Sequence, residues 1–410
     1  MRAYRPLASF TLCFTVGIEP AAAGLLEDSH ATVDFRNLYF DRDFRQSGGN
    51  TLNGLSQARE WGQGIVFQLQ SGFSDGPVGF GLDSILMSGF RLDSTEDRAG
   101  TGMFPKQSNG RSVDEFSRAG VSAKMKVSKT SFRSGVMTYK KPVIQSADSR
   151  LLPVLLKGTT IESHELTNLT IHAARFTEAM ALDSSSWEKL TSRFGGGSDK
   201  FVLYGADYDA AKNVQIRFYQ GELDGIYKQS IANAIAGFDL TKSQRVSMDI
   251  RLAKGSEVGS FRGIDNKAYG ALLGYRFGSQ TISFGYQKMD GKDAYPYVNG
   301  TDPYLVNFIQ ILQFSNAGER SRQVRYDLDL AAWGIPGLSF MTRYVTGDHI
   351  QLSQGSEGRE WERNTDISYV IQSGQFKNFS VRWRNATVRS SFGNDIDENR
   401  IIVAYPLTLF

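Results

Sequence analysis

The chain has 410 residues, of which 12% are aromatic and 22% are charged, and its 46 Lys and Arg residues nearly balance its 43 Asp and Glu residues. This balance argues against a nucleic-acid binder, which usually carries a basic excess. The 42 Gly residues, the 10 Pro residues and the lack of a low-complexity tract are typical of a β-rich chain with many turns.

Residues 1–23 are predicted to form a secretory signal peptide, and residues 24–410 a single domain. The basic "MRAYRP" precedes the short apolar "LASFTLCFTVGI", and "AAAG" provides small residues for cleavage after Ala23. An N-terminal core helix is the alternative. Cys13, the one cysteine, lies in the apolar segment, so the mature chain has no thiol for a disulfide or a Cys-ligated metal.

Several later segments alternate apolar and polar residues with period two, which predicts β-strands. In chain order they are "VQIRFYQ" (214–220), "RVSMDIRLA" (245–253), "YGALLGYRFGSQTISFGYQK" (269–288), "QVRYDLDLAAW" (323–333), "LSFMTRY" (338–344), "TDISYVIQSG" (365–374) and "NFSVRWRNATV" (378–388). "GIPG" between the fourth and fifth predicts a hairpin turn.

These strands favour an all-β, transmembrane antiparallel barrel over a soluble sandwich or propeller. They run longer than the usual 5–6 residues, and Tyr and Phe cluster at their ends, as in the aromatic girdles of membrane barrels. Long segments near 91–118, 139–168, 183–199 and 289–321 are predicted as loops that fold inward and narrow the lumen. At roughly 20–25 residues per strand with its connections, the chain predicts roughly 16–18 strands around an aqueous lumen.

Alternation places seven arginines on the polar face of these strands. An arginine facing lipid at the bilayer midplane would cost about 2–4 kcal/mol, so this face is predicted to line the lumen. The set is Arg217, Arg251, Arg276, Arg325, Arg343, Arg382 and Arg384, against Asp249, Asp327, Asp329 and Asp366. Arg382 and Arg384 lie on one strand that supplies no acid, so they are predicted to recognise carboxylate through the guanidinium fork. Pairing with lumen acids that braces the wall is the alternative.

Neither an enzyme nor a metal site is predicted. The four histidines, His30, His164, His172 and His349, are scattered and form no recognisable metal site. Asp348 precedes His349, but adjacent residues of a strand point to opposite faces, so no catalytic pair is expected. An outer-membrane barrel phospholipase or protease, and an adhesive barrel with a closed lumen, are the rival classes.

The chain resembles the OprD-type substrate-specific outer-membrane porins over essentially its whole mature length. The motifs are "FRNLYFDRDFR" (35–45), "REWGQG" (59–64), "RAGVSAKMKVSKT" (118–130), "ARFTE" (174–178), "GTDPYLVNFIQ" (300–310), "GERS" (318–321), "WERNTDISYVIQSG" (361–374), "VRWRNAT" (381–387) and "DENRIIVAYPL" (397–407). The resemblance implies one barrel of about eighteen strands, with a narrow eyelet formed by the third and seventh loops.

The resemblance also implies a ladder of basic residues that guides a substrate carboxylate. Carried over residue by residue, the ladder would comprise Arg36, Arg45, Arg150, Arg175, Arg382, Arg384 and Arg400. Strict alternation would turn Arg175 outward, so a bulge or strand end is needed there. Asp302 and Tyr304 of the seventh loop would face the ladder.

The function implied is passive, selective uptake of small carboxylate-bearing solutes through the outer membrane of a Gram-negative bacterium, without a cofactor. A channel of the same family that prefers basic amino acids and peptides is the alternative. Outer-membrane lipid and lipopolysaccharide would surround a monomer or weak trimer.

Overall fold

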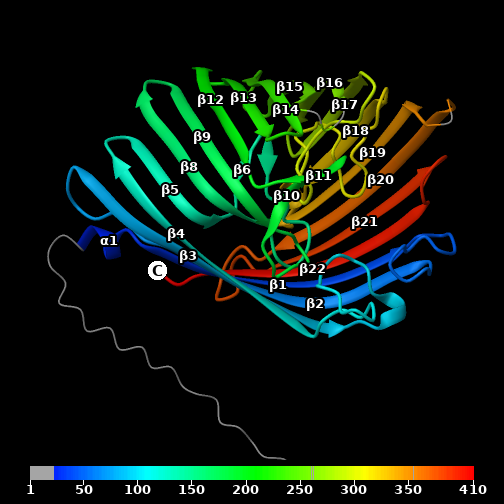
Figure 1. Ribbon diagram of the computed structural model, residues 1–410, viewed down its shortest axis with the longest axis horizontal. Coiled ribbons are helices and arrows are strands. Elements are labelled where there is room, and N and C mark those ends of the chain that lie inside the picture. Colours follow the sequence, from blue (N-terminus) through cyan, green and yellow to red (C-terminus); the bar gives the residue numbers. More distant parts are fainter. Residues whose placement is uncertain (1–22, 260, 262, 354) are drawn as a thin grey trace, which may run out of the picture.

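The computed structural model describes residues 23–259, 261, 263–353 and 355–410, so residues 1–22 of the predicted signal peptide, including Cys13, lie outside the described residues. Eighteen antiparallel strands of this part of the chain form a closed barrel (Figure 1). The wall strands are β1 (His30–Asp43), β2 (Gln57–Gln70), β3 (Val78–Asp93), β4 (Glu115–Val127), β5 (Thr130–Met137), β8 (Leu155–Leu166), β9 (Leu169–Met180), β12 (Phe201–Ala211), β13 (Val214–Leu223), β14 (Tyr227–Asp239), β15 (Gln244–Glu257), β16 (Asp265–Phe277), β17 (Gln280–Asp290), β18 (Arg320–Asp329), β19 (Leu338–Gln351), β20 (Glu357–Val370), β21 (Ser380–Ser390) and β22 (Ile396–Thr408).

Seven short elements lie outside the wall. They are α1 (Ala23–Glu27), η2 (Glu96–Arg98), η3 (Leu330–Trp333), β6 (Lys140–Lys141), β7 (Ile144–Gln145), β10 (Glu188–Ser192) and β11 (Gly195–Ser198). Over the described residues, no helix has the length and apolar character needed to cross a membrane.

Pairing between the first and last strands closes the wall. Thr32 lies opposite Thr408 at one end of this ladder, and Asp43 lies opposite Asp397 at the other. The wall sheet therefore has no free edge. Its backbone N–H and C=O groups are hydrogen-bonded between strands, which is necessary because lipid offers them no hydrogen-bond partner. The start of β1, the end of β22 and the short turns share one end of the barrel, here called the turn end. The opposite end carries the long connections and is called the loop end.

The wall faces follow the predicted alternation. On β16, the side chains of Tyr269, Leu273 and Tyr275 are exposed on the outer surface. Aromatic side chains meet near the turn end, where the rings of Tyr275 and Phe277 are 5.7 Å apart. Farther toward the loop end the rings of Tyr344 and Trp361 are 5.5 Å apart. The barrel thus carries an aromatic girdle at both ends of its apolar outer band.

Two of the predicted loop boundaries are wrong. The segment 139–168 is not one loop, because β8 begins at Leu155 within it, and 183–199 contains β10 and β11. The predicted "GIPG" hairpin is confirmed: η3 ends at Trp333 and β19 begins at Leu338. Here the side chain of Asp329 accepts a hydrogen bond from the Ala331 N–H and caps η3.

The predicted separation of Asp348 and His349 onto opposite faces is also wrong. A register shift between Gly347 and Ile350 interrupts the β19–β20 ladder, and His349 has a φ of 59°. This bulge brings Nδ1 of His349 within 2.5 Å of Oδ1 of Asp348. Asp348 also accepts from Arg322 at 2.9 Å, so the group is an ion-pair cluster at the loop end.

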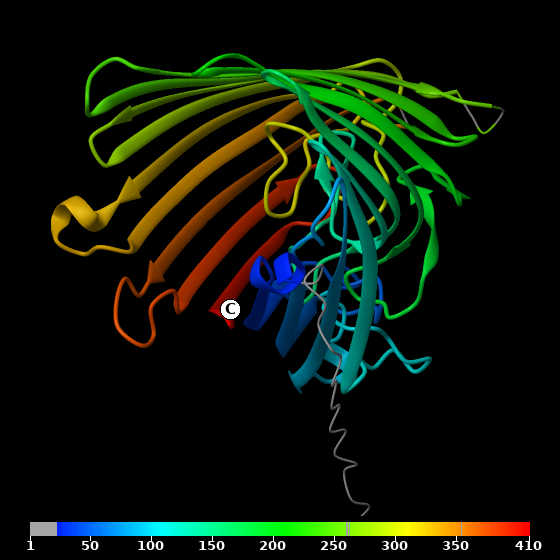
Figure 2. The same cartoon turned by 90° about the vertical axis from the view of Figure 1, so that its left-hand side faces the viewer.

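The third loop (138–154) and the seventh loop (291–319) pack against the inner wall, as do Phe104 of the connection 94–114 and Leu190 of β10. Leu151 and Leu152 of the third loop join a buried cluster with wall residues that include Phe40. Tyr295 of the seventh loop packs against Met289 of the wall. A β-bridge between Ser146 and Thr301 joins the loops to each other. In Figures 1 and 2 the seventh loop, drawn in yellow, lies within the curve of the wall.

Two glycines of "REWGQG" let the third loop approach the wall. A Cβ at Gly64 would lie 2.8 Å from the carbonyl oxygen of Leu151, and one at Gly62 would lie 2.6 Å from a Leu151 methyl group. At Gly64 the close atom belongs to the loop backbone, so the loop would have to shift, whereas at Gly62 the Leu151 side chain would have to move. Gly at both positions therefore fixes how far the third loop projects into the lumen.

Candidate functional site

Three arginines surround one phenylalanine on the inner wall next to the third loop. The guanidinium carbons of Arg400, Arg150 and Arg42 lie 4.6, 5.0 and 5.3 Å from the centre of the Phe40 ring. Arg400 and Arg42 both bind the buried carboxylate of Glu398, at 2.7 and 2.5 Å. The Phe40 ring and the Glu398 carboxylate allow these arginines to lie close together despite their like charges. Each of the two groups offers negative potential to more than one guanidinium group.

Arg150 differs from its neighbours because no carboxylate binds it. Its Nε donates to the carbonyl of Thr101 at 2.7 Å, and one Nη donates to the carbonyl and hydroxyl of Ser149. Burial lowers the pKa of Arg150 to about 9, and the charges of Arg400 and Arg42 act in the same direction. Arg150 therefore stays protonated at neutral pH and contributes an uncompensated positive charge.

Arg384 and Arg382 continue this row of arginines toward the turn end. Arg384 lies directly opposite Arg400 on β22 and opposite Asp366 on β20. Arg382 donates to both oxygens of Asp366 at 2.5–2.9 Å, and Nε of Arg384 lies 3.3 Å from the same carboxylate. The expectation that this pair lacks a local acid is therefore wrong: β21 supplies none, but the neighbouring strand does.

Arg36 also faces the lumen, but it is neutralised. Its two Nη groups bind both oxygens of Asp148 in the third loop at 2.6 and 3.1 Å, and one donates to the carbonyl of Arg150 at 2.7 Å. This bidentate pair ties β1 to the third loop. Arg36 therefore adds an anchor for the loop rather than a free charge.

Two predicted ladder residues lie elsewhere. Arg45 pairs at 2.8 Å with Asp397, whose position in β22 places it on the outer face. Arg175 is exposed on the outer face of β9, between the buried Ala174 and Phe176 of the inner face. The β8–β9 register shifts twice, between Lys157 and Gly158 and between Ser163 and Leu166, but neither shift turns Arg175 inward.

Asp302 of the seventh loop lies beside the third loop. Its backbone N–H donates to the carbonyl of Gln145 at 2.8 Å. Burial raises the pKa of the Asp302 carboxyl to about 6; Lys140 and Arg150 lower it, whereas Asp148 raises it further. A carboxyl with that pKa changes charge within the physiological range and borders the row of arginines.

Tyr304 of the seventh loop lies against β13–β15, on the wall opposite the arginines. Its hydroxyl donates to Oδ1 of Asn233 at 2.8 Å and accepts from Arg217 at 3.4 Å. The guanidinium of Arg251 lies 4.0 Å from the centre of its ring. Arg251 in turn pairs with Asp249 at 2.6 Å, so the bracing alternative describes this side of the lumen.

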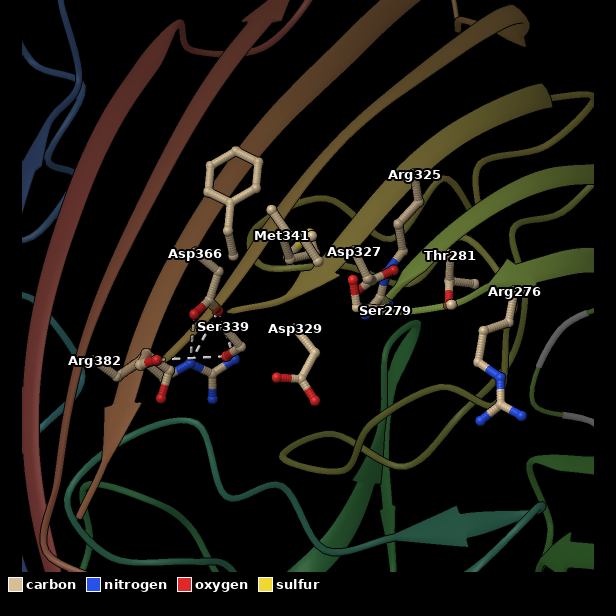
Figure 3. Close-up of a pocket in the computed structure, with 14 residues that line it drawn as sticks. Arg276, Ser279, Thr281, Arg325, Asp327, Asp329, Ser339, Met341, Asp366 and Arg382 are labelled. Carbon is tan, nitrogen blue, oxygen red and sulfur yellow. Dashed lines mark hydrogen bonds and ion pairs between the residues drawn. The ribbon is translucent and has the colours of Figure 1, made fainter. Parts of the chain in front are cut away.

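A cavity of about 490 Å³ opens below Arg382 toward the turn end (Figure 3). Arg382, Arg325 and Arg276 reach into it from three strands, and Asp327 pairs with Arg325 at 2.6 Å. Cations and carboxylates thus line this vestibule together, while the arginines dominate above it.

Sequence reasoning missed Arg42 and Glu398. Arg42 lies within the quoted "FRNLYFDRDFR" and shares the parity of the inward-facing Arg36 and Phe40. Glu398 lies two residues before Arg400 on the same strand, so it shares that residue's face. The alternation of inward and outward side chains was applied only to the central strands. Applied to the first and last strands as well, it would have predicted that Arg42 and Glu398 face the lumen.

Comparisons with known proteins agree with this architecture. The profile described as "outer membrane porin, OprD family" matches residues 23–409. Porin D of Pseudomonas aeruginosa is 32% identical, with 96% of this chain and 94% of that protein covered. The P. aeruginosa OccK3 (OpdO) structure is 43% identical with a TM-score of 0.84, over 95% of this chain and 98% of that one. P. aeruginosa OpdK, solved with vanillate, is 33% identical with a TM-score of 0.88, over 94% and 100%.

The matches cover nearly the whole chain, the wall closes on itself, and all these relatives are porins or porin structures and not enzymes. The chain therefore belongs to the OprD family of outer-membrane porins.

Proposed function

We propose that the chain is a channel for passive, selective diffusion of small carboxylate-bearing solutes, guided by the arginine column of Arg42, Arg150, Arg400, Arg384 and Arg382. One observation carries the proposal: these five guanidinium groups have only two hydrogen-bonded carboxylates among the described residues, Glu398 and Asp366. A solute carboxylate entering the column would find positive charge that the wall does not neutralise.

Free donor capacity in the column supports the same proposal. Nη2 of Arg400 is a buried N–H donor without a hydrogen-bond partner among the described residues, and Nε of Arg384, although 3.3 Å from the Asp366 carboxylate, makes no hydrogen bond. Buried donors are rarely left unpaired, because the lost bond to water costs about 1–3 kcal/mol. A carboxylate oxygen or a water molecule is the partner that such donors require.

From Arg400 to Arg382, exposure of the column increases toward the vestibule. The exposed fraction of the side chain is 2% for Arg400, 19% for Arg384 and 45% for Arg382. Water screens a charge more strongly as its exposure rises, so each step toward the turn end holds an anion less tightly. Conduction needs this combination of favourable entry and easy release.

The similarity to OpdK, whose structure was solved with vanillate, supports a carboxylate as the solute class, because vanillate carries a carboxylate. That likeness extends to this chain only as a proposal.

Liposome swelling with solutes of matched size provides the test. Gluconate and sorbitol have the same carbon skeleton, but only gluconate is charged, and neither crosses lipid. Arg384→Ala removes a charge-assisted hydrogen bond worth about 1.5–3 kcal/mol, so gluconate flux should fall roughly tenfold while sorbitol flux stays nearly unchanged. Arg382→Ala should have a smaller effect because its side chain is more exposed.

The matched control is Arg245→Ala, a lumen arginine on β15 that pairs with Asp239 at 3.0 Å. This change should alter neither flux. Arg384→Lys should recover part of the gluconate flux, because lysine keeps the charge but loses the fork. Equal slowing of gluconate and sorbitol by Arg384→Ala would show that the column braces the wall. Faster flux of lysine than of gluconate would favour the alternative channel for basic amino acids.

A further inference from the structure

The outer wall carries an apolar groove along β14. The strands β13–β16 that form this part of the barrel lie side by side in Figure 1. Ser230 and Ala232 are small outward side chains, and Phe218, Leu252 and Tyr269 on the neighbouring strands are larger. The resulting cavity measures about 220 Å³. On a surface that faces lipid, a groove of this shape is filled by an acyl chain, because hydrocarbon contacts replace the missing side-chain atoms.

Two lysines close the groove at its loop end. Lys254 on β15 and Lys267 on β16 both line it, and the two residues lie directly opposite each other in the β15–β16 ladder. Residues in that relation have Cβ atoms about 4.5–5.5 Å apart, and like charges there destabilise the sheet. Within the part of the chain that the structure describes, neither side chain has a hydrogen-bond or ion-pair partner.

Nearby acids form no ion pair with these lysines among the described residues. Asp290 lies opposite Lys267 in the ladder, and Glu222 lies opposite Lys228, a third outward lysine on β14. Asp265 lies two positions before Lys267 on β16. Among the described residues, none of these carboxylates comes within 4.0 Å of a lysine nitrogen of this group. No carboxylate of the barrel wall is therefore bound to these lysines. An anion from outside the chain would be needed to pair with them.

The depth of the two lysines indicates what that anion is. Lys267 lies two residues nearer the loop end than Tyr269, an outward aromatic of the girdle. Girdle aromatics sit at the boundary between hydrocarbon and headgroups, so the lysines lie at headgroup level. Long loops of such barrels are extracellular. The lipid at this height therefore belongs to the outer leaflet of the outer membrane, where the main lipid is a phosphorylated, multiply acylated glycolipid.

We propose that this face binds one molecule of that glycolipid, with a phosphate between Lys254 and Lys267 and an acyl chain in the groove over Ser230 and Ala232. The phosphate removes the repulsion between the lysines, and the chain fills the groove. The site lies on the outside of the barrel and is independent of the solute path.

Purified protein in detergent provides the test, with bisphosphorylated lipid A as the probe and native mass spectrometry as the readout. The double variant Lys254→Gln/Lys267→Gln should bind lipid A at least about tenfold more weakly, because two charge-assisted contacts are lost. The matched control is Lys242→Gln, an exposed lysine in the turn at the opposite end of the β14–β15 hairpin, which should bind like the parent. Ala232→Leu fills the groove and should also weaken binding.

The unfolding temperature provides a second readout. The difference between the double variant and the parent should change sign when lipid A is added. Without lipid, the double variant should unfold at a slightly higher temperature than the parent, because the opposed charges are gone. With saturating lipid A the order should invert, because only the parent gains the binding free energy. Lipid A affinity that is unchanged in the double variant would overturn the proposal. So would equal affinity for dephosphorylated lipid A, or for phosphatidylglycerol, which would make the occupant an ordinary phospholipid.

Discussion

At the scale of single residues, the arginines of the lumen differ in whether a neighbouring carboxylate neutralises their charge. Arg251 forms an ion pair with the adjacent Asp249, and Arg36 forms one with Asp148, so neither charge is available to a solute. Arg150 has only carbonyl and hydroxyl partners, and its charge remains available. Residue type alone therefore does not identify a ladder member; the decisive feature is the balance of guanidinium and carboxylate groups within hydrogen-bond distance.

Asp302 gives a prediction at this scale. Its pKa is raised to about 6, mainly by burial, so the carboxyl is ionised at pH 7.5 and largely neutral at pH 5. Protonation removes a negative charge beside Arg150, so the ratio of anion to cation permeability should increase as the pH falls through about 6. Reversal potentials in a salt gradient measure that ratio.

Asp302→Asn mimics the neutral form, so it should show the parent's low-pH anion preference at every pH from 5 to 7.5. If the variant keeps the full pH dependence of the parent, a group other than Asp302 is responsible.

At the scale of elements, the third loop is positioned by β2. The loop backbone reaches Gly64 so closely that a methyl group there would lie 2.8 Å from the Leu151 carbonyl oxygen. Gly64→Ala should therefore displace the loop and Arg150 with it, while the barrel still forms. We expect an altered single-channel conductance and a reduced preference for gluconate over sorbitol.

Gly197→Ala in β11 is the matched control, because a Cβ at that position meets its nearest atoms at 3.7 Å, which is ordinary contact. This control should conduct like the parent. A Gly64→Ala channel with unchanged conductance and selectivity would show that the loop tolerates the shift, and that glycine there has no role in setting the lumen width.

At the scale of the whole molecule, stability depends on how the inward loops are fastened to the wall. The seventh loop returns to the wall at Glu319, which is 1% exposed and lies beside Glu360 of β20. The side-chain amide of Asn316 donates to both carboxyls, at 3.0 and 3.3 Å. Burial and the neighbouring Glu360 carboxyl raise the pKa of Glu319 well above its ordinary value.

A pH dependence of barrel stability follows. In the unfolded chain Glu319 loses its proton near its ordinary pKa of 4.5, whereas the folded barrel retains that proton to higher pH. The folded state binds more protons between those two pKa values, so the free energy of unfolding should fall as the pH rises through this window. Thermal unfolding in detergent between pH 5 and 9 measures the slope. Glu319→Gln should make it shallower, and an unchanged slope would assign the dependence to other groups.

Some features were determined by the sequence alone, because they depend on local periodicity. A strand alternates its faces whatever it pairs with, so Arg382 and Arg384 had to share a face with each other and oppose Trp383. The lipid penalty then turns that face toward the lumen. The barrel class and the inward facing of these arginines follow from such local rules.

Only the tertiary structure decided which groups meet. Strand register places Arg384 opposite Asp366 on one neighbouring strand and opposite Arg400 on the other. Loop packing places Tyr304 on the wall opposite the column. Arg45 could reach the outer-face Asp397 because the first and last strands close the barrel. These contacts join residues up to 352 positions apart. The composition of a single strand carries no information about the register of its neighbour, because register is set by the closed sheet as a whole.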